Sequence, residues 1–158
     1  MQILKILGVI LILTAGGLAA ATAVRFEQKK IRILESWIDL IFHIRTQIDC
    51  YLMPLGEILE QADRALIASC MCVLPNPNLT QIYHASQFYL GNEARRLLCA
   101  FVREIGTSYR EEQVRRCDYY MSALRGLRSK ARDELPARIR VTVAVCVAVS
   151  VGAAILLW

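Results

Sequence analysis

Residues 141-VTVAVCVAVSVGAAILLW-158 form an 18-residue stretch in which no side chain is charged. A second such stretch, 3-ILKILGVILILTAGGLAAATAV-24, runs for 22 residues with Lys5 as its single charge. A helix needs about 20 apolar residues to cross the roughly 30 Å hydrocarbon core of a bilayer. The sequence therefore predicts two transmembrane helices, an N-terminal one over residues 1–24 and a C-terminal one over residues 141–158.

The C-terminal stretch also has valine at every odd position from 141 to 151, which is the period of a β-strand. The residues between these valines are small or weakly polar, so a strand would have no clearly polar face. A single strand would also leave its backbone groups unpaired in lipid. We therefore expect a helix here.

Residues 25–140 hold 18 of the 19 Lys and Arg residues and all 14 Asp and Glu residues. The basic residues gather beside the two apolar stretches: Arg25, Lys29, Lys30, Arg32, Arg125, Arg128, Lys130, Arg132, Arg138 and Arg140. Lys and Arg beside transmembrane helices favour the cytoplasmic side, where they can also contact anionic lipid headgroups. The pattern predicts a cytoplasmic α-helical domain over residues 25–140 and does not favour binding to nucleic acid.

A cleavable signal peptide is the alternative interpretation of the N-terminal stretch. Lys5, the apolar core and the triplet Ala21-Thr22-Ala23 resemble such a peptide and its cleavage site. Cleavage would place the domain outside the cytoplasm. The basic residues from Arg25 to Arg32 and the length of the apolar core favour a retained helix.

The domain between the spans is expected to be helical throughout. Apolar residues at spacings of three and four continue the first span as one helix, and Ser108 with Glu111 fits a capping box at the start of the last. The shorter helices are expected at Pro54–Ala68, Leu79–Tyr89 and Glu93–Ile105. The predicted fold class is all-α: a membrane-anchored antiparallel helical hairpin or bundle, with a transmembrane helix at each end and short helices packed between.

Small residues recur four positions apart in both spans: Gly16 with Ala20, Gly17 with Ala21, and Ala144 with Ala148 and Gly152. This spacing lets two helix backbones approach closely in a membrane. We expect these residues to pack the two spans against each other, and self-association of the chain is the alternative.

The sequence holds no motif of a phosphate loop, a nucleophile elbow or a zinc protease. Cys70-x-Cys72 lacks the second pair that a zinc site needs, so we expect neither metal nor cofactor. Five cysteines, an odd number, lie outside the C-terminal span without a regular spacing, so we expect reduced thiols. A charged face of Glu57, Glu60, Asp63 and Arg64 is the candidate for binding a partner. An ordinary solvated surface is the alternative for that face.

Two short motifs have counterparts in a known family. Pro54-Leu55-Gly56-Glu57 resembles a Pro-Leu-x-Glu step, and Ile105-Gly106 is followed seven residues later by Gln113. With an apolar helix at each end, the whole chain resembles the stage III sporulation protein AB family. Tyr109 stands where that family has an aspartate, and residues 70–77 match nothing in its pattern.

The resemblance implies a non-enzymatic platform in the channel between mother cell and forespore, similar to the inner-membrane platform proteins of type II secretion. Such a protein would lie in the mother-cell membrane facing the forespore. It would couple a cytoplasmic hexameric secretion-type ATPase to other stage III channel components, with a homo-oligomer as an open option. The alternatives are a membrane-anchored regulator or adaptor unrelated to secretion, and a small membrane enzyme that uses the cysteines.

Overall fold

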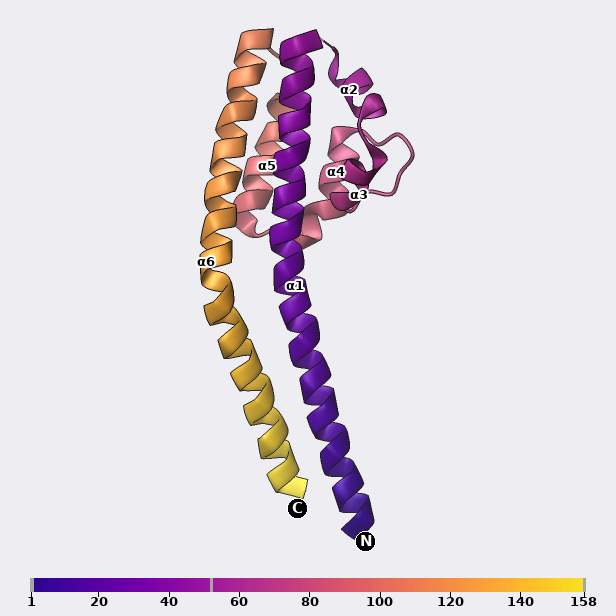
Figure 1. Ribbon diagram of the computed structural model, residues 1–158, viewed down its shortest axis with the longest axis vertical. Helices are drawn as coiled ribbons and strands as arrows, with labels where there is room; N and C mark the ends of the chain where they lie inside the picture. Colours follow the sequence, from indigo (N-terminus) through magenta and orange to yellow (C-terminus); the bar gives the residue numbers. More distant parts are fainter. Residues whose placement is uncertain (1, 52, 158) are drawn as a thin grey trace. The chain divides into compact units, whose positions relative to one another are not determined.

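The computed structural model describes residues 2–51 and 53–157, with side chains for residues 8, 11, 14–51, 53–153 and 155. These residues form helices and connecting turns, with no strand among them, which confirms the predicted all-α class (Figure 1). The helices are α1 (Gln2–Tyr51), α2 (Leu55–Gln61), α3 (Arg64–Ser69), α4 (Leu79–Ser86), the 3-10 helix η1 (Gln87–Tyr89), α5 (Asn92–Glu104) and α6 (Arg110–Leu157).

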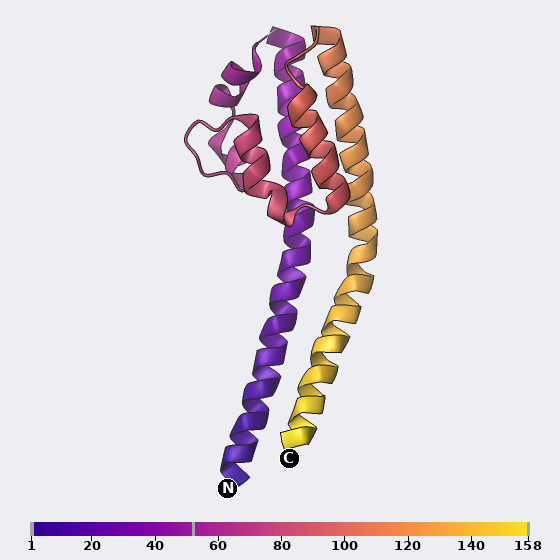
Figure 2. The ribbon, with the colours of Figure 1, turned by 180° about the vertical axis from the view of Figure 1, so that it is seen from behind.

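The chain divides into two compact units. Unit 1 contains the described residues up to 28 together with those from 132 onwards, and unit 2 is Lys29–Ala131. The long helices α1 and α6 contribute to both units, whereas the short helices belong to unit 2 alone. In unit 2 the short helices lie against α1, as the two opposite views in Figures 1 and 2 show.

The core of unit 2 is built on one face of α1. Its fully buried side chains recur at spacings of three and four, as an amphipathic helix requires: Ile33, Trp37, Leu40, Ile41 and Ile44. Helices α2, α4, α5 and α6 add fully buried apolar side chains to this core: Ile58, Ile82, Leu98, Phe101 and Leu124. The apolar spacing of three and four noted in the sequence therefore corresponds to buried side chains from Leu34 to Ile48.

Trp37 is fully buried at the centre of this core. A buried indole N–H needs an acceptor, because leaving it unpaired costs free energy. Its Nε1 donates to Ser86 Oγ at 2.9 Å, and Ser86 Oγ in turn donates to the Tyr83 carbonyl oxygen at 3.1 Å. This short chain of hydrogen bonds fixes α4 against α1.

The predicted helix over residues 54–68 is wrong, because two helices replace it. α2 ends at Gln61 and α3 begins at Arg64. Between them, the Asp63 carboxylate accepts a hydrogen bond from the Ala65 backbone N–H at 2.8 Å, which is the geometry of an N-cap. The break lets both short helices turn apolar residues inward, Ile58 from α2 and Ile67 from α3.

The predicted helix over residues 79–89 is present as α4 followed by the single turn η1. A reciprocal capping box starts α4: Asn78 Oδ1 accepts from the Gln81 N–H at 2.8 Å, and Gln81 Oε1 accepts from the Asn78 N–H at 2.9 Å. After η1, Arg95 Nη2 donates to the Gln87 carbonyl oxygen at 3.1 Å and to that of Leu90 at 3.4 Å. The guanidinium therefore holds the η1 turn in shape.

The turn between α5 and α6 depends on Gly106, whose φ of +83° lies in the left-handed region. The turn is also tied by the Gln113 side chain, whose Nε2 donates to the Ser108 carbonyl oxygen. We predicted that Glu111 would pair with Ser108 in a capping box. Instead α6 begins at Arg110, and Gln113 is the residue that reaches back.

Replacing Gly106 with alanine is expected to destabilise unit 2 by about 1–2 kcal/mol, because a Cβ is strained at this φ. We expect the melting temperature of the full chain in detergent, followed by circular dichroism, to fall by roughly 4–8 °C per kcal/mol. Gly56→Ala is the matched control, since Gly56 lies inside α2 with open space around its Cβ position. Alanine at position 56 should leave stability unchanged or raise it, and an equal loss for both variants would contradict the argument.

In unit 1 the two long helices approach closely at Gly16. A Cβ added there would lie 1.9 Å from Ser150 Oγ and 3.7 Å from the Cys146 carbonyl oxygen. Ser150 is buried, and its hydroxyl donates to the Cys146 carbonyl oxygen at 2.8 Å within its own helix. Thr14 and Thr22 satisfy their hydroxyls in the same way, as apolar surroundings require.

The predicted packing residues of the spans are divided between two environments. Gly16 and Ala20 are half-buried, as is Gly152, whereas Ala144 and Ala148 are exposed. The side chain that α6 presents to Gly16 is that of Ser150. The exposed alanines instead line an open apolar groove along α6 with Ile139, Arg140, Val143, Val147 and Val151.

The apolar part of α6 is a helix, so the helical interpretation of the alternating valines is confirmed. Within the described residues, α6 is long and apolar enough to cross a membrane, and almost none of that part is buried. Its valines from 141 to 151 are exposed on several sides of the helix. The span predicted over residues 1–24 stays a prediction, and many of its side chains lie outside the described set.

Pro136 lies inside α6, and the helix continues through it. A proline has no backbone N–H, so it cannot donate to the carbonyl oxygen four residues earlier, at Arg132. No proline interrupts α1 between Gln2 and Tyr51. α6 therefore lacks one backbone hydrogen bond at this turn, whereas no proline removes such a bond from α1.

Candidate partner-binding surface

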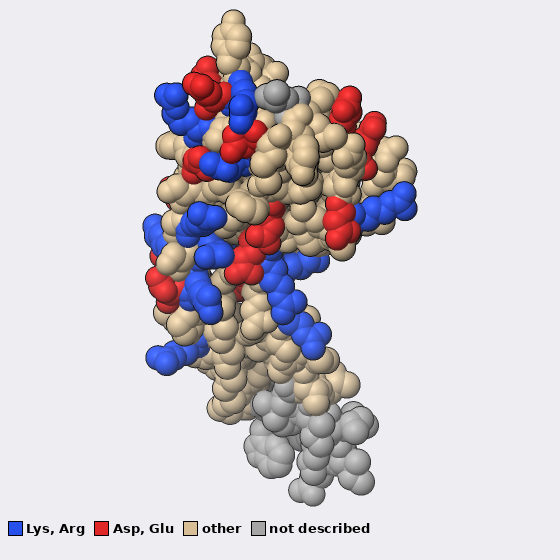
Figure 3. Space-filling model, turned by 45° about the horizontal axis from the view of Figure 1, so that its top comes forward, with Lys and Arg blue, Asp and Glu red and all other residues tan. Residues whose placement is uncertain are grey.

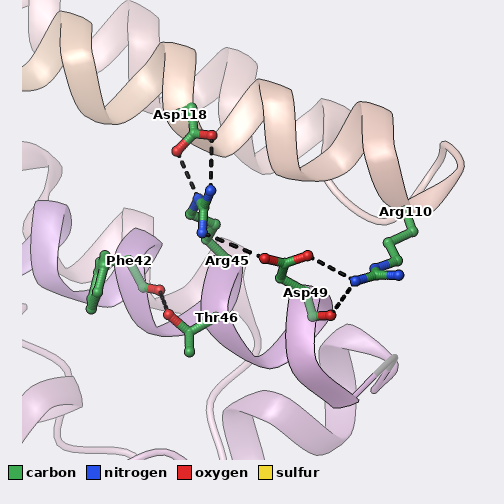
Figure 4. A network of polar contacts seen from close by, with 6 residues as sticks. All are labelled: Phe42, Arg45, Thr46, Asp49, Arg110 and Asp118. Carbon is green, nitrogen blue, oxygen red and sulfur yellow. Dashed lines mark hydrogen bonds and ion pairs between the residues drawn. The ribbon is translucent and has the colours of Figure 1, made fainter.

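A row of ion pairs joins α1 to α6 along the surface of unit 2 (Figure 4). Arg45 donates from Nε to Asp118 Oδ1 at 2.7 Å and from Nη2 to Asp118 Oδ2 at 3.2 Å. Arg45 Nη1 also lies 3.8 Å from Asp49 Oδ2. Asp49 in turn accepts from Arg110, whose Nη2 lies 2.8 Å from Asp49 Oδ1. The hydrogen bonds that Arg45 donates to Asp118 raise the pKa of Arg45, so this guanidinium stays charged.

A further pair, Arg128 with Glu35 at 3.8 Å, extends the row. Partners later in α1 meet residues earlier in α6, so the two helices run antiparallel within unit 2. The charged side chains in the row are partly exposed, and exposed pairs contribute only about 0.2–1 kcal/mol each. Their main effect is to fix the register of α1 against α6, while the buried core supplies the stability.

The predicted partner-binding face does not lie on one helix. Glu57 and Glu60 are on α2, Asp63 caps α3, and Arg64 is the first residue of α3. All four side chains are exposed. The Asp63 carboxylate already accepts a hydrogen bond from the Ala65 backbone N–H. Of the four residues, only Glu57 and Glu60 therefore remain as exposed side chains on the same helix, α2.

Exposed tyrosines occur where α1 ends and α6 begins. Tyr51 is 67% exposed and Tyr109 is 91% exposed. The Arg110–Asp49 ion pair holds these helix ends together, and Leu55 at the start of α2 lies 3.9 Å from the Cβ position of Gly106. We call this region, formed by the end of α1, the start of α2 and the α5–α6 turn, the far end of unit 2.

Sequence reasoning missed both tyrosines. Tyr51 lies at a spacing that continues the apolar period of α1, and that period gave no sign that its side chain would be exposed. Each is exposed because the chain leaves its helix at that point and no element covers it. The signal available in the sequence was their position, since both lie within three residues of a helix end.

An open polar pocket of about 620 Å³ lies between α5 and α6 in unit 2, lined by Glu104, Glu112, Arg115, Arg116, Tyr119 and Tyr120. Its groups bind one another. Arg116 Nη2 lies 2.6 Å from Glu112 Oε1, and the Tyr120 hydroxyl donates to Glu104 Oε2 at 2.9 Å. Burial and the Glu104 hydrogen bond raise the pKa of Tyr120 to about 12. The pocket is thus a network that joins the end of α5 to α6.

The cysteines are free thiols in differing environments. Burial raises the pKa of Cys70 to about 12 and that of Cys117 to about 11, so both stay protonated at neutral pH. A protonated thiol is a poor nucleophile and a poor metal ligand. Among the described residues, no group of three or more His, Cys, Asp or Glu side chains is placed to hold a metal ion. Cys50 is the exposed cysteine, one residue before Tyr51.

The C-terminal part of the chain, residues 81–158, matches the family model of stage III sporulation protein AB (spore_III_AB). Over these residues the chain is similar to the stage III sporulation protein AB family. The match includes the Ile105-Gly106 step, Gln113 and the whole of α6, whereas the Pro54 step and α1 precede it. No curated protein and no solved structure matches the chain.

The matched residues include the turn between α5 and α6. Gly106 and Gln113, which both lie within the matched residues, build the turn that presents Tyr109. The family match indicates a role in sporulation, and the apolar part of α6 indicates association with a membrane.

Proposed function

We propose that the chain is a non-enzymatic scaffold of the channel complex between mother cell and forespore. In this role it couples a cytoplasmic hexameric secretion-type ATPase to the other stage III sporulation channel components in the membrane. The observation that carries the proposal is the family match over residues 81–158. The membrane-spanning length of apolar α6 supports it, because a scaffold of this kind needs an anchor.

In the proposed arrangement both ends of the chain cross the mother-cell membrane that faces the forespore, as a helical hairpin. Unit 2 then lies in the cytoplasm, on the side favoured by the basic residues next to the apolar stretches. The antiparallel pairing of α1 and α6 within unit 2 supports a hairpin.

Labelling of Cys50 tests this arrangement, because its side chain is exposed whereas Cys70, Cys72 and Cys117 are buried. We expect a membrane-impermeant maleimide to modify Cys50 only after the cells are permeabilised. The control is Cys50→Ser, which should remove most of the labelling. Modification of Cys50 in intact cells would place unit 2 outside the cytoplasm and would contradict the ATPase proposal.

The far end of unit 2 is the proposed contact with the ATPase. Tyrosine is enriched among the residues that dominate the binding energy of protein interfaces, and Tyr51 and Tyr109 are both exposed here. The Arg110–Asp49 pair and the tied α5–α6 turn hold them in place, so little conformational freedom is lost on binding. Glu57 on neighbouring α2 adds an exposed charge beside them.

The double variant Tyr51→Ala/Tyr109→Ala is expected to weaken binding of the ATPase to the full chain in nanodiscs by at least about 30-fold, the effect of losing one dominant interface residue. Spore formation should fall with it. Phe42→Ala is the matched control, since Phe42 is an exposed aromatic of α1 that lies outside the far end. Unchanged ATPase binding in the double variant would favour an adaptor with another partner.

A further inference from the structure

The opposite end of unit 2 has an exposed aromatic side chain of its own. Phe88, in the single turn η1, is 73% exposed. The next residue, Tyr89, has its ring beneath Lys29, with the Lys29 Nζ 4.3 Å from the ring centroid. This cation–π contact brings η1 to the first residue of unit 2 on α1.

The η1 turn is built to hold Phe88 outward. Arg95 clamps the carbonyl oxygens on both sides of the turn, at Gln87 and Leu90. The Phe88 and Tyr89 rings meet edge to face at 5.4 Å. Phe88 is therefore an exposed apolar ring on a turn whose shape is fixed.

The residues of α1 and α6 near this end of unit 2 are mostly basic, which indicates what kind of surface they could bind. On α1, residues 29–36 contain Lys29, Lys30 and Arg32 against the single acid Glu35. Residues 124–131 of α6 contain Arg125, Arg128 and Lys130 and no acid, and the Arg128–Glu35 pair brings the two segments together. Figure 3 shows blue Lys and Arg side chains on this face of the molecule, with fewer red Asp and Glu side chains among them. A basic surface with an aromatic side chain beside it complements an anionic membrane surface.

The place of Lys29 in the sequence agrees with this surface. Lys29 follows Val24, the last residue of the predicted first span, by five residues. The Tyr89 ring packs on Lys29, so η1 contacts the part of unit 2 that comes directly after the predicted span in the chain. Basic residues in such a juxtamembrane segment are attracted to anionic headgroups.

We propose that η1 is a lipid-binding turn, in which Phe88 inserts among the headgroups of an anionic leaflet and Lys29 binds a lipid phosphate. The inference rests on the membrane placement in the proposed function and adds a contact that the spans alone do not supply. The far end of unit 2 offers an internal comparison. Asp49, which binds Arg110, is 20 residues or about 30 Å from Lys29 along α1, so Tyr109 is too far away to reach the same headgroups.

Quenching of tryptophan fluorescence by nitroxide lipids tests the contact in the full chain. The background is Trp158→Phe, in which the fully buried Trp37 gives a constant signal. Phe88→Trp, Tyr109→Trp and Val147→Trp are each placed in nanodiscs of phosphatidylcholine and phosphatidylglycerol, with the nitroxide near the headgroup or deep in the acyl chain. Val147 lies on the exposed face of apolar α6 and reports the span itself.

We expect the shallow nitroxide to reduce the emission of Phe88→Trp at least twofold beyond the background, and to leave that of Tyr109→Trp unchanged. Quenching of Phe88→Trp should weaken without phosphatidylglycerol, and weaken further with Lys29→Gln. An unquenched tryptophan at position 88, with Val147→Trp quenched by the deep nitroxide, would overturn the lipid contact alone and leave Phe88 for a protein partner. Loss of quenching at both positions would overturn the membrane placement as well, and equal quenching at 88 and 109 would overturn the localised contact.

Discussion

Replacing Trp37 with alanine is expected to destabilise unit 2 by about 3–5 kcal/mol, the range for removing a large aromatic side chain from a protein core. Trp37 is fully buried, and its removal would leave a cavity between α1 and α4 and deprive Ser86 of its donor. Unit 2 has about 100 residues, so the melting temperature should fall by more than roughly 10 °C. Thermal unfolding of the full chain in detergent, followed by circular dichroism, measures the change.

Two milder variants separate packing from hydrogen bonding at the same place. Ser86→Ala removes the acceptor and leaves the indole N–H buried without a partner, which should cost about 1–3 kcal/mol. Trp37→Phe keeps most of the apolar volume and should fall between the wild type and alanine. If Trp37→Ala melted within a few degrees of the wild type, the core described around α1 would be wrong.

Gly16→Leu is the substitution with the largest expected effect in unit 1. Even a Cβ would lie 1.9 Å from Ser150 Oγ, and leucine adds three more carbon atoms in the same direction. Forcing extra volume into a packed contact typically costs about 1–3 kcal/mol, and here the two helices would have to separate. We expect lower thermal stability and a lower yield of folded protein from membranes.

Gly17→Leu is the matched control, because it places the same side chain one residue later. No atom lies within 4 Å of the Cβ position of Gly17, so leucine there should be tolerated. Shortening Ser150 to alanine should partly rescue the smaller variant Gly16→Ala, since it removes the closest atom. Equal losses from leucine at 16 and 17 would show that packing of α1 against Ser150 is not what the glycine provides.

The sequence predicted the long helices and their buried face, because hydrophobic periodicity over many residues is a strong signal. Trp37, Ile41 and Ile44 follow that period and are fully buried. Tyr51 follows it too and is exposed, because α1 ends there and the period carries no information about the end of a packed partner.

The shorter elements were harder to predict. Asp63 can stay in a helix or cap a new one, and the choice depends on whether Ile58 and Ile67 both reach the core, which only the folded chain decides. The packing of unit 1 was harder still. Ala144 and Ser150 lie on different sides of one apolar helix. The spacing of small residues favoured the side of Ala144, whereas the side that meets Gly16 is that of Ser150.

The absent amide at Pro136 gives the two long helices different stiffness. Without a hydrogen bond to the Arg132 carbonyl, this turn of α6 resists bending and stretching less than its neighbours. Proline-free α1 lacks a weak point of this kind. If the chain is placed under mechanical load, we expect α6 to bend at this turn, five residues before its apolar stretch begins at Val141. We expect α1 to stay straighter, because no proline interrupts it.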